Sequence, residues 1–405
     1  MNKTRLDRWI CQTEGIPELN LELLEELQLK KLNEILARMK QRRGFYRDLP
    51  DKLESLSQLK QLPFTTPEDI SREPMQFLLT SQSEISRIIS GATSGTTGPA
   101  KRVFYTARDT AHTVGFFAAG IGEMLHPGEK CLIAFPFTGP FGLGDLIAQA
   151  VDELGGTPIK AGFGQNYEEL RNLTRETQPE TYIGFPVSLL GLARFYGAEF
   201  PIQRALVSAD ACPEGVMEEL ERILGSKLYP HYGSREMCLG GAITCPAFHG
   251  MHLRENHIIA EIIDDVGNPL PDGQWGELVI TTIDMEAMPL IRYRTGDRAR
   301  FLPEKCPCGG ITRRLDRVSR MEIGLTMEIL DSELFCCSSL VDYRITSGDT
   351  FQIEALTLDG QEGSLSAILN KLIPEKNFRL LISKASPQHR PMYPGKRFLL
   401  PEIPR

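Results

Sequence analysis

The chain has 405 residues, of which 41% are hydrophobic and 24% are charged, close to the averages of globular proteins. This length exceeds one small core and suits a large domain with a smaller one, while the composition excludes a mostly disordered chain. The net charge of −8 supplies no basic field for nucleic acid, so a small-molecule partner is favoured.

The N-terminal sequence and the cysteines indicate the compartment. Residues 1–15 (MNKTRLDRWICQTEG) contain no apolar core of signal-peptide length. No apolar run approaches the roughly 20 residues that span a bilayer. The nine cysteines are irregularly spaced. We therefore expect a cytoplasmic protein that does not bind membranes, with reduced thiols that can still bind metal.

The expected elements begin with a helix. Leucines at helical spacing over residues 21–42 predict an amphipathic helix that packs on a domain surface. From about Ile85 onward, short apolar strands alternate with turns and helices, which is typical of a parallel sheet. Thr106 and Asp109 resemble a capping box that opens a helix after a glycine-rich loop. The expected strands are 131–135, 157–160, 182–185 and 205–207, and the expected helices include 145–154 and 216–224.

Two further modules follow along the chain. The short strands HIIAEIID and GELVITT, split by a turn-rich segment, predict an antiparallel β-subdomain over about 243–315. The last segments read as strand, helix and strand, which predicts a small α+β cap. We place the boundary at Asp316–Arg317, giving a large domain over 1–316 and a small mobile C-terminal domain over 317–405. The predicted fold class is α/β, with parallel sheets and helices beside the antiparallel subdomain.

A glycine-rich loop, TSGTTGPAK, ends at Lys101. Its backbone N–H groups and hydroxyls suit phosphate oxygens, and the lysine adds positive charge. It is not a Walker loop, because Ala100 and Arg102 flank the lysine where GK[ST] is required. The alternative is a surface hairpin of turn residues. The candidate phosphate-binding residues are Thr93, Ser94, Gly95, Thr96, Thr97, Gly98 and Lys101.

Two later motifs suit a nucleotide. The sequence HYGSRE at 231–236 sets an aromatic ring beside a glycine, which makes a slot for a purine, and the carboxylate of Glu236 suits a hard cation that bridges phosphates. The sequence PLIRYRTGD ends at Asp297, whose two carboxylate oxygens suit two ribose hydroxyls. Taken alone, each motif also fits an ordinary strand end or turn.

With these motifs in this order, the sequence resembles the adenylate-forming (AMP-binding) enzymes, and most closely the phenylacetate-CoA ligase group. The resemblance covers roughly Ile88 to Leu315 and is weaker toward the C-terminus. It implies that the glycine-rich loop holds the β- and γ-phosphates of ATP, and the loop departs from the family only in the order of Pro99 and Ala100.

The resemblance also assigns the nucleotide-binding residues. It implies that Tyr232 packs on adenine, that Glu236 binds Mg²⁺ and that Asp297 binds the ribose. The segment Ser208-Ala209-Asp210 occupies the place of the family's Gly-Ala-Glu segment, which lines the adenine pocket; a plain strand-end turn explains it nearly as well. Besides the phosphate loop, the implied cofactor-binding residues are Ser208, Ala209, Asp210, His231, Tyr232, Gly233, Ser234, Glu236, Asp297 and Arg317.

Two cations near the C-terminal end are implied to act in catalysis with Lys101. Arg317 falls where the family has its hinge and an arginine that contacts ATP. Lys396, in PMYPGKR, matches the terminal PxxxxGK lysine that reaches the reacting carboxylate and the α-phosphate, where it can offset developing charge. A solvated tail is the alternative for Lys396. Residues 318–328 lack the family's usual GRxDD and RGxN patterns.

The acid pocket is expected between the parallel sheet and the turn FPFTGPFG at 135–142, with residues 233–241 as its opposite wall. Aromatic rings there can stack on an aryl acid, or they can simply pack the core. The pocket candidates are Phe137, Phe141, Gly142, Gly233 and Gly240.

A structural zinc site is also predicted. Cys306 and Cys308 form a CxC clamp, and Cys245 with His249 or His252 can complete a tetrahedral site. The phenylacetate-CoA ligase group has a similar Cys–x6–His spacing, which favours His252. Buried reduced cysteines are the alternative.

The implied activity is a two-step ligation. A small carboxylic acid, expected to be aryl, reacts with Mg·ATP to give an acyl-AMP and pyrophosphate, and the thiol of CoA or of a carrier protein's phosphopantetheine then displaces AMP. A homodimer is compatible with this activity. One rival is an adenylyltransferase that leaves AMP on a hydroxylated acceptor. Another is a non-catalytic nucleotide-binding protein, which Arg235 and the altered hinge favour.

Overall fold

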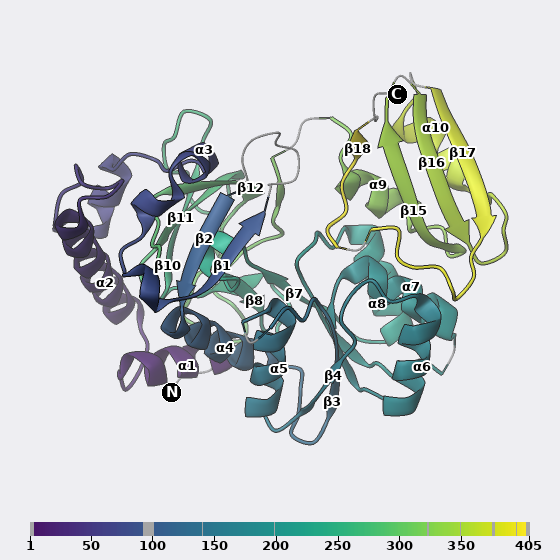
Figure 1. Cartoon of the computed structure of the whole chain (residues 1–405), viewed down its shortest axis with the longest axis horizontal. Helices are drawn as coiled ribbons and strands as arrows, with labels where there is room; N and C mark the ends of the chain where they lie inside the picture. Colours follow the sequence, from purple (N-terminus) through teal and green to yellow (C-terminus); the bar gives the residue numbers. More distant parts are fainter. Residues whose placement is uncertain are drawn as a thin grey trace. The chain divides into compact units, whose positions relative to one another are not determined.

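The computed structural model describes residues 4–91, 101–139, 141–197, 199–321, 324–348, 350–374, 377–393 and 395–401 (Figure 1). The chain divides into two compact units. The first comprises Met1–Glu123, Gly139–Phe141 and His231–Met321, and the second comprises Met124–Thr138, Gly142–Pro230 and Glu322–Arg405.

The first unit begins with helices, and the longest has the predicted bounds. In α2 (Leu21–Arg42), the Asn20 side chain accepts the Leu23 N–H at the start, and Arg43 adopts a left-handed conformation at the end. Its apolar face packs into the core of this unit because the leucines recur at helical spacing. The other elements before the first strand are α1 (Arg5–Glu14), α3 (Pro67–Arg72) and three 3-10 turns at Leu56–Gln61, Pro74–Phe77 and Gln82–Glu84.

The glycine-rich loop joins two strands, as the sequence predicts. β1 (Ile85–Gly91) and β2 (Lys101–Thr106) pair antiparallel, and Gly91 lies opposite Lys101. Thr106 then caps α4 (Ala107–Ile121) through the predicted capping box with Asp109. Lys101, the last residue of the glycine-rich motif, is therefore the first residue of β2.

The predicted antiparallel subdomain is confirmed in the first unit. A four-stranded sheet has the order β10-β11-β12-β14, with every pair antiparallel. A second set of short antiparallel strands pairs in the order β7-β8-β9-β13, beginning with His231 and Tyr232 at the end of β7 (Tyr229–Tyr232). The strands of these sets are β8 (Ala242–Thr244), β9 (Met251–Leu253), β10 (Ile258–Ile263), β11 (Gly276–Thr282), β12 (Tyr293–Ala299), β13 (Arg314–Leu315) and β14 (Ser319–Arg320).

The second unit contains the predicted parallel sheet. Its strand order is β4-β3-β5-β6-β7, and each neighbouring pair is parallel. The four predicted strands agree with the observed ones to within one residue at each end. The strands are β3 (Lys130–Ala134), β4 (Thr157–Lys160), β5 (Thr181–Gly184), β6 (Arg204–Val207) and β7 (Tyr229–Tyr232), and the helices are α5 (Leu143–Glu153), α6 (Tyr167–Thr177), α7 (Pro186–Tyr196) and α8 (Glu214–Leu224).

The C-terminal segment belongs to the second unit from residue 322 onward. Its helix α9 and strand β15 share one hydrophobic core with α7 and α8, in which Leu190, Val216, Leu330 and Tyr343 are buried. The domain boundary at Asp316–Arg317 stays a prediction. The segment contains α9 (Met327–Leu334), β15 (Leu340–Ser347), β16 (Thr350–Thr357), α10 (Leu365–Leu372), β17 (Asn377–Lys384) and β18 (Leu400–Pro401).

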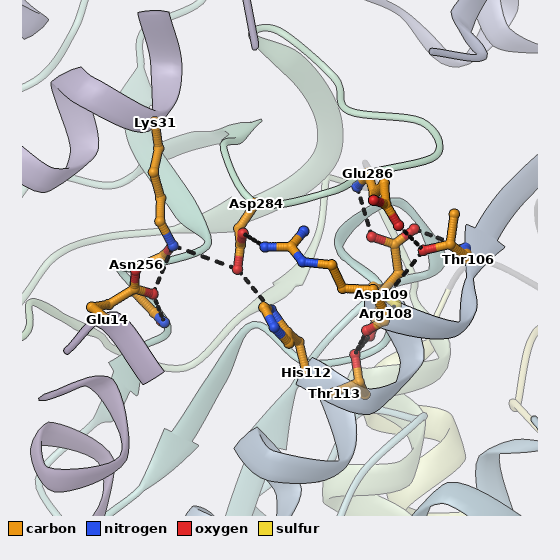
Figure 2. Close-up of polar contacts among 11 residues, drawn as sticks. Glu14, Lys31, Thr106, Arg108, Asp109, His112, Thr113, Asn256, Asp284 and Glu286 are labelled. Atoms are coloured by element: carbon orange, nitrogen blue, oxygen red, sulfur yellow. Dashed lines mark hydrogen bonds and ion pairs between the residues drawn. The ribbon is translucent and has the colours of Figure 1, made fainter. Parts of the chain in front are cut away.

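A polar network buried in the first unit ties its N-terminal helices to the segment between β11 and β12 (Figure 2). Asp284 accepts hydrogen bonds at 2.8 Å from Arg108 and from His112, both on α4. The ammonium of Lys31 on α2 lies 3.5 Å from the same carboxylate and donates at 2.6 Å to Glu14 on α1. One carboxylate thus connects α2 and α4 to the β-subdomain. In the part of the chain that the structure describes, no helix is long and apolar enough to cross a bilayer.

The charge of Asp284 gives a testable stability effect. Burial opposes its ionisation, but the His112 hydrogen bond and the Lys31 charge outweigh burial and hold its pKa far below the usual range. Because the folded-state pKa is depressed, the stabilisation is full above about pH 4 and is lost as the pH falls toward the folded-state pKa. We expect Asp284→Asn to lower the free energy of unfolding at pH 7 by about 1.5 to 3 kcal/mol, since it removes the charged acceptor that Arg108, His112 and Lys31 share.

Urea unfolding between pH 7 and pH 3 measures this effect. The difference from wild type should shrink below about pH 4. The exposed Asp265→Asn is the matched control and should stay within about 0.5 kcal/mol of wild type. Equal unfolding midpoints for Asp284→Asn and wild type at pH 7 would contradict the assignment.

Candidate active site

The predicted phosphate lysine and the predicted magnesium ligand meet in the first unit. Lys101, the first residue of β2, is 8% exposed, and its ammonium pairs with the carboxylate of Glu236. Glu236 lies on a 3-10 turn, Arg235–Met237, and is also buried. Tyr293 on β12 accepts a hydrogen bond from Lys101 at 2.7 Å and donates one to Glu236 at 3.2 Å. The Tyr293 hydroxyl thus contacts both members of the buried Lys101–Glu236 ion pair.

The electrostatics keep Glu236 anionic at neutral pH. Burial raises its pKa, but the charge and hydrogen bond of Lys101, together with hydrogen bonds from the backbone of Glu236 and from Ser234, outweigh burial, so the pKa of Glu236 is lowered overall. Burial and the Glu236 charge raise the pKa of Tyr293, so its hydroxyl stays protonated and donates. Mg²⁺ is commonly held by one or two carboxylates together with substrate phosphates. A single ionised carboxylate beside a phosphate-type lysine fits that donor set.

The predicted adenine and ribose residues also meet. The Tyr232 hydroxyl donates to one oxygen of Asp297 at 2.7 Å, and Arg320 donates to the other at 2.8 Å. Asp297 on β12 lies opposite Arg320 on β14, so the strand register sets this contact. Arg320 also donates to the Thr295 carbonyl at 2.9 Å. Both oxygens of the Asp297 carboxylate therefore accept hydrogen bonds from side chains of the first unit.

The loop after Tyr232 requires glycine. A Cβ at Gly233 would lie 2.0 Å from the Leu239 carbonyl oxygen, and a Cβ at Gly240 would lie 2.5 Å from the Phe116 ring. The Ser234 carbonyl accepts the Leu239 N–H at 2.8 Å, which closes the loop. Leu239 has a φ of 69°, a strained conformation for a side chain with Cβ. Such strain is concentrated at ligand sites, although it does not define one.

His231 precedes this loop. Its ring lies 5.5 Å from that of Phe117 and 6.0 Å from that of Phe116. Burial lowers the pKa of His231 to about 4, so the imidazole is neutral at pH 7. It therefore adds no charge to the predicted nucleotide site.

Other predicted residues lie in the second unit. Ser208, Ala209 and Asp210 follow β6, with Ser208 buried and Ala209 at a φ of 65°. Asp210 accepts the backbone N–H of Arg397 at 2.8 Å, and burial raises the pKa of Asp210 to about 6. Lys396, the residue before Arg397, is exposed. The strand-end turn and the predicted lysine segment thus meet within one unit.

Three pocket candidates and most of the phosphate loop stay as predictions. Residues 93–98 lie outside the described part of the chain. Phe141 belongs to the first unit, whereas Phe137 and Gly142 belong to the second. The Phe137 ring receives the ammonium of Lys160 at 5.3 Å, and Gly142 is the N-cap of α5.

The sequence motifs did not identify Arg320 as a site residue. Arg317, the predicted ATP contact, is exposed, and its backbone N–H donates to its neighbour Asp316. The arginine beside Asp297 is instead Arg320. A second arginine three residues further on was the available signal, but only the β12–β14 register shows which one reaches the site. An ATP role for Arg317 stays a prediction.

The four predicted zinc ligands come together. The ligand atoms of Cys245, His252, Cys306 and Cys308 all lie within 4.8 Å of one another. The sulfurs of Cys245 and Cys306 are 3.6 Å apart, close to the ~3.7 Å expected for two thiolates on one tetrahedral zinc. His249 contacts Arg314 at 2.8 Å and is not part of this group.

The surroundings of the cluster also fit zinc. The Nδ1 atom of His252 lies 3.1 Å from the Thr312 carbonyl oxygen, which leaves Nε2 directed at Cys308, 3.3 Å away. Such outer-shell contacts orient a metal-binding imidazole. Four protein donors leave no open coordination position, so zinc here would be structural. It would join β8, β9 and the segment before β13.

Comparison with known proteins shows the family to which the chain belongs. Residues 92–285 match the family of AMP-binding enzymes. The phenylacetate-coenzyme A ligase of Thermus thermophilus is 30% identical over 323 residues, which cover 74% of this chain and 69% of the relative. The chain belongs to the phenylacetate-coenzyme A ligase family. The Escherichia coli K12 member is 32% identical over 285 residues, covering 67% of this chain and 63% of that protein.

Solved structures place the fold with other adenylate-forming ligases. A 2-hydroxyisobutyryl-CoA ligase in the postadenylation state, bound to 2-HIB-AMP, has a TM-score of 0.77 at 17% identity, covering 94% of this chain and 90% of that one. The same enzyme in the thioesterification state, with 2-HIB-AMP and CoA, has a TM-score of 0.69 at 19% identity, covering 95% and 91%. The predicted α/β fold class is confirmed. This family membership makes the chain an AMP-forming acid–thiol ligase.

Metal removal tests the zinc site of this phenylacetate-CoA ligase family member. We expect purified protein to hold about one zinc per chain, because the donor set is complete. Cys306→Ser should lose most of that zinc and lower the unfolding temperature by about 5 °C or more, since metal binding contributes to folding. The measurements are metal analysis and thermal unfolding. Cys336→Ser, at an exposed cysteine outside the cluster, is the control and should retain its zinc.

Proposed function

We propose that this chain activates a small aryl carboxylic acid with ATP and transfers the acyl group to the thiol of CoA. The observation that carries the proposal is the contact of Lys101 with Glu236 in the same unit as the contacts of Asp297 with Tyr232 and Arg320. The first pair suits phosphates and a cation, and the second group suits a nucleoside. Glu236, Asp297 and Arg320 all influence the pKa of Tyr293, and both carboxylates raise the pKa of Arg320.

The first step forms an acyl-phosphate bond. A carboxylate oxygen of the acid attacks the α-phosphorus of ATP, and pyrophosphate leaves with the electron pair of the broken P–O bond. Mg²⁺, held by Glu236, would neutralise charge on the phosphates. The Lys101 ammonium would then pair with phosphate oxygens of ATP in place of Glu236. Lys396 would offset charge that develops at the α-phosphate, which makes this step a matter of positioning and electrostatics.

The second step forms the thioester. The thiol sulfur attacks the acyl carbon, its proton is lost to solvent or base, and AMP leaves. The similarity to phenylacetate-coenzyme A ligases supports CoA as the acceptor of the acyl group. An aryl acid is supported by the same names and by the aromatic segment that contains Phe137 and Phe141. A carrier-protein thiol is the alternative acceptor.

ATP–pyrophosphate exchange over a panel of acids tests the proposal. Phenylacetate and benzoate should support exchange better than acetate and hexanoate, and mass analysis with CoA should detect the aryl thioester. Lys101→Ala should slow exchange by about 100-fold or more, because it removes a cation that stabilises the transition state. Lys227→Ala, at an exposed lysine, is the matched control and should leave exchange unchanged.

The products separate the alternatives. Exchange with aliphatic acids alone would overturn the aryl assignment but leave the ligase. A stable AMP ester on a hydroxylated acceptor, in place of a thioester, would identify an adenylyltransferase. Exchange at the wild-type rate in Lys101→Ala would contradict the assigned role of that lysine.

A second measurement distinguishes the two arginines. Arg320 fixes the Asp297 carboxylate through a charge-assisted hydrogen bond, and loss of such a bond costs about 1.5 to 3 kcal/mol. We therefore expect Arg320→Gln to raise the KM for ATP by about 10-fold or more. Arg317→Gln is measured beside it, because Arg317 is the ATP contact that the family resemblance implies. Steady-state kinetics at saturating acid measure both variants, and a larger effect at Arg317 would reverse the assignment.

A further inference from the structure

The last described part of the chain forms a strap on the second unit. We define the strap as residues 385–393 and 395–401, which run from the end of β17 to β18 (Figure 1). Two strap residues, Pro391 and Tyr393, line a small pocket together with Ala134 at the end of β3 and Phe185 after β5. The strap therefore lies over the carboxyl ends of these parallel strands, where ligands of open α/β sheets bind.

One buried guanidinium holds the strap. Arg397 is 5% exposed, and its Nε donates to Asp331 on α9 at 3.0 Å. Its Nη1 donates to Asp342 at 2.7 Å and its Nη2 to the Tyr343 carbonyl at 3.1 Å, both on β15. The rings of Tyr343 and Tyr393 each lie 4.7 Å from the guanidinium carbon. Each guanidinium nitrogen thus has an acceptor, which a buried cation requires.

Both carboxylates have further donors that fix their positions. Asp331 accepts the Tyr343 hydroxyl at 2.6 Å, and Asp342 accepts the backbone N–H of Met392 at 2.6 Å. Asp342 thus binds the strap twice, once through a side chain and once through the backbone. A network in which every member is satisfied rigidifies the segment that it holds.

The strap is also docked on the turn after β6. The backbone N–H of Arg397 donates to Asp210 at 2.8 Å, and Asp210 also accepts the N–H of Ala211 at 2.9 Å. Ala209, just before Asp210, has a φ of 65°, a conformation that costs energy for a residue with Cβ. The strained turn directs a carboxylate at the backbone of the strap.

We propose that Arg397 is a positioning residue that sets the place of Lys396 beside the turn after β6. Consecutive Cα atoms are about 3.8 Å apart, so fixing Arg397 fixes the base of the Lys396 side chain. Only the side-chain torsions of Lys396 then remain to be adjusted, and its head is exposed. The inference rests on the proposed function, in which Lys396 acts at the α-phosphate.

The test is ATP–pyrophosphate exchange in the full chain with an aryl acid that the wild type accepts. Arg397→Met should lower kcat by about 10- to 100-fold, since small misplacements of a reacting group cost that much. The KM for ATP should change less than kcat, because Tyr232 and Asp297 lie in the other unit, and Arg397 contacts Asp210 through its backbone N–H, which Arg397→Met keeps. Arg397→Lys should restore part of the rate, since one ammonium cannot fill all of these contacts. Arg344→Met, at an exposed arginine of β15, is the control and should match wild type.

A double-mutant cycle separates positioning from general damage. If Arg397 acts through Lys396, Arg397→Met should cause no further loss in the Lys396→Ala background. Additive effects of the two changes would overturn the proposal, as would a wild-type kcat in folded Arg397→Met.

A second pair of variants covers the case in which Arg397→Met does not fold. Asp210→Ala removes the acceptor of the Arg397 N–H and leaves the guanidinium pairs in place, so kcat should fall. Asp210→Asn keeps an acceptor oxygen and should be closer to wild type. Equal kcat values for Asp210→Ala and wild type would overturn the docking step.

The outcomes also distinguish this inference from the proposed function. If the wild type gives no acid-dependent exchange, the proposed function fails. If the wild type exchanges but Lys396→Ala is equally fast, the lysine role and this inference fail, while the ligase assignment stands.

Discussion

The buried pair of Lys101 and Glu236 is the interaction on which the candidate site depends. Removing two charges from water costs several kcal/mol per ion, which their attraction repays only with good geometry and further hydrogen bonds. Tyr293 supplies one such bond to each partner. The pair also joins β2, which follows the glycine-rich loop, to the 3-10 turn after β7 and to β12. Segments far apart in sequence are thereby held together before any ligand binds.

The same pair explains how one site can serve both a cation and an anion. Lys101 and Glu236 neutralise each other in the structure, so no net buried charge remains. Under the proposed function, ATP with Mg²⁺ would offer each of them a partner of opposite sign, so neither charge would be left unpaired when the ligand binds.

Local patterns explain how much of the fold could be predicted. The bounds of α2 were correct because Asn20 caps it and leucines mark its face, and the parallel strands were found because turn residues punctuate apolar runs. The four clustered Cys and His residues were predicted because CxC spacing and Cys–x6–His spacing are each local, and the family resemblance paired the two halves. Each of these signals is a pattern along one continuous segment of chain.

The contacts that were missed are all long-range. Arg320 reaches Asp297 through a strand register between residues 23 apart, and Arg397 reaches Asp210 across 187 positions. No local pattern encodes either pairing, because register and packing select one arginine among several. Arg317 matched a family position in sequence, yet pairing in β14 brought the other arginine to the carboxylate.

The adjacent cations of the strap show why residue type matters as much as position. Arg397 is buried among two carboxylates and a carbonyl, a set that a planar guanidinium can satisfy with donors in several directions. Lys396 is exposed, and a flexible stem with a compact charge suits a group that must reach a reacting atom. Exchanging the two side chains would keep the charge of the strap but remove both properties. The adjustable ammonium of Lys396 thus directly precedes the rigid anchor Arg397, and each side chain suits its own position in the strap.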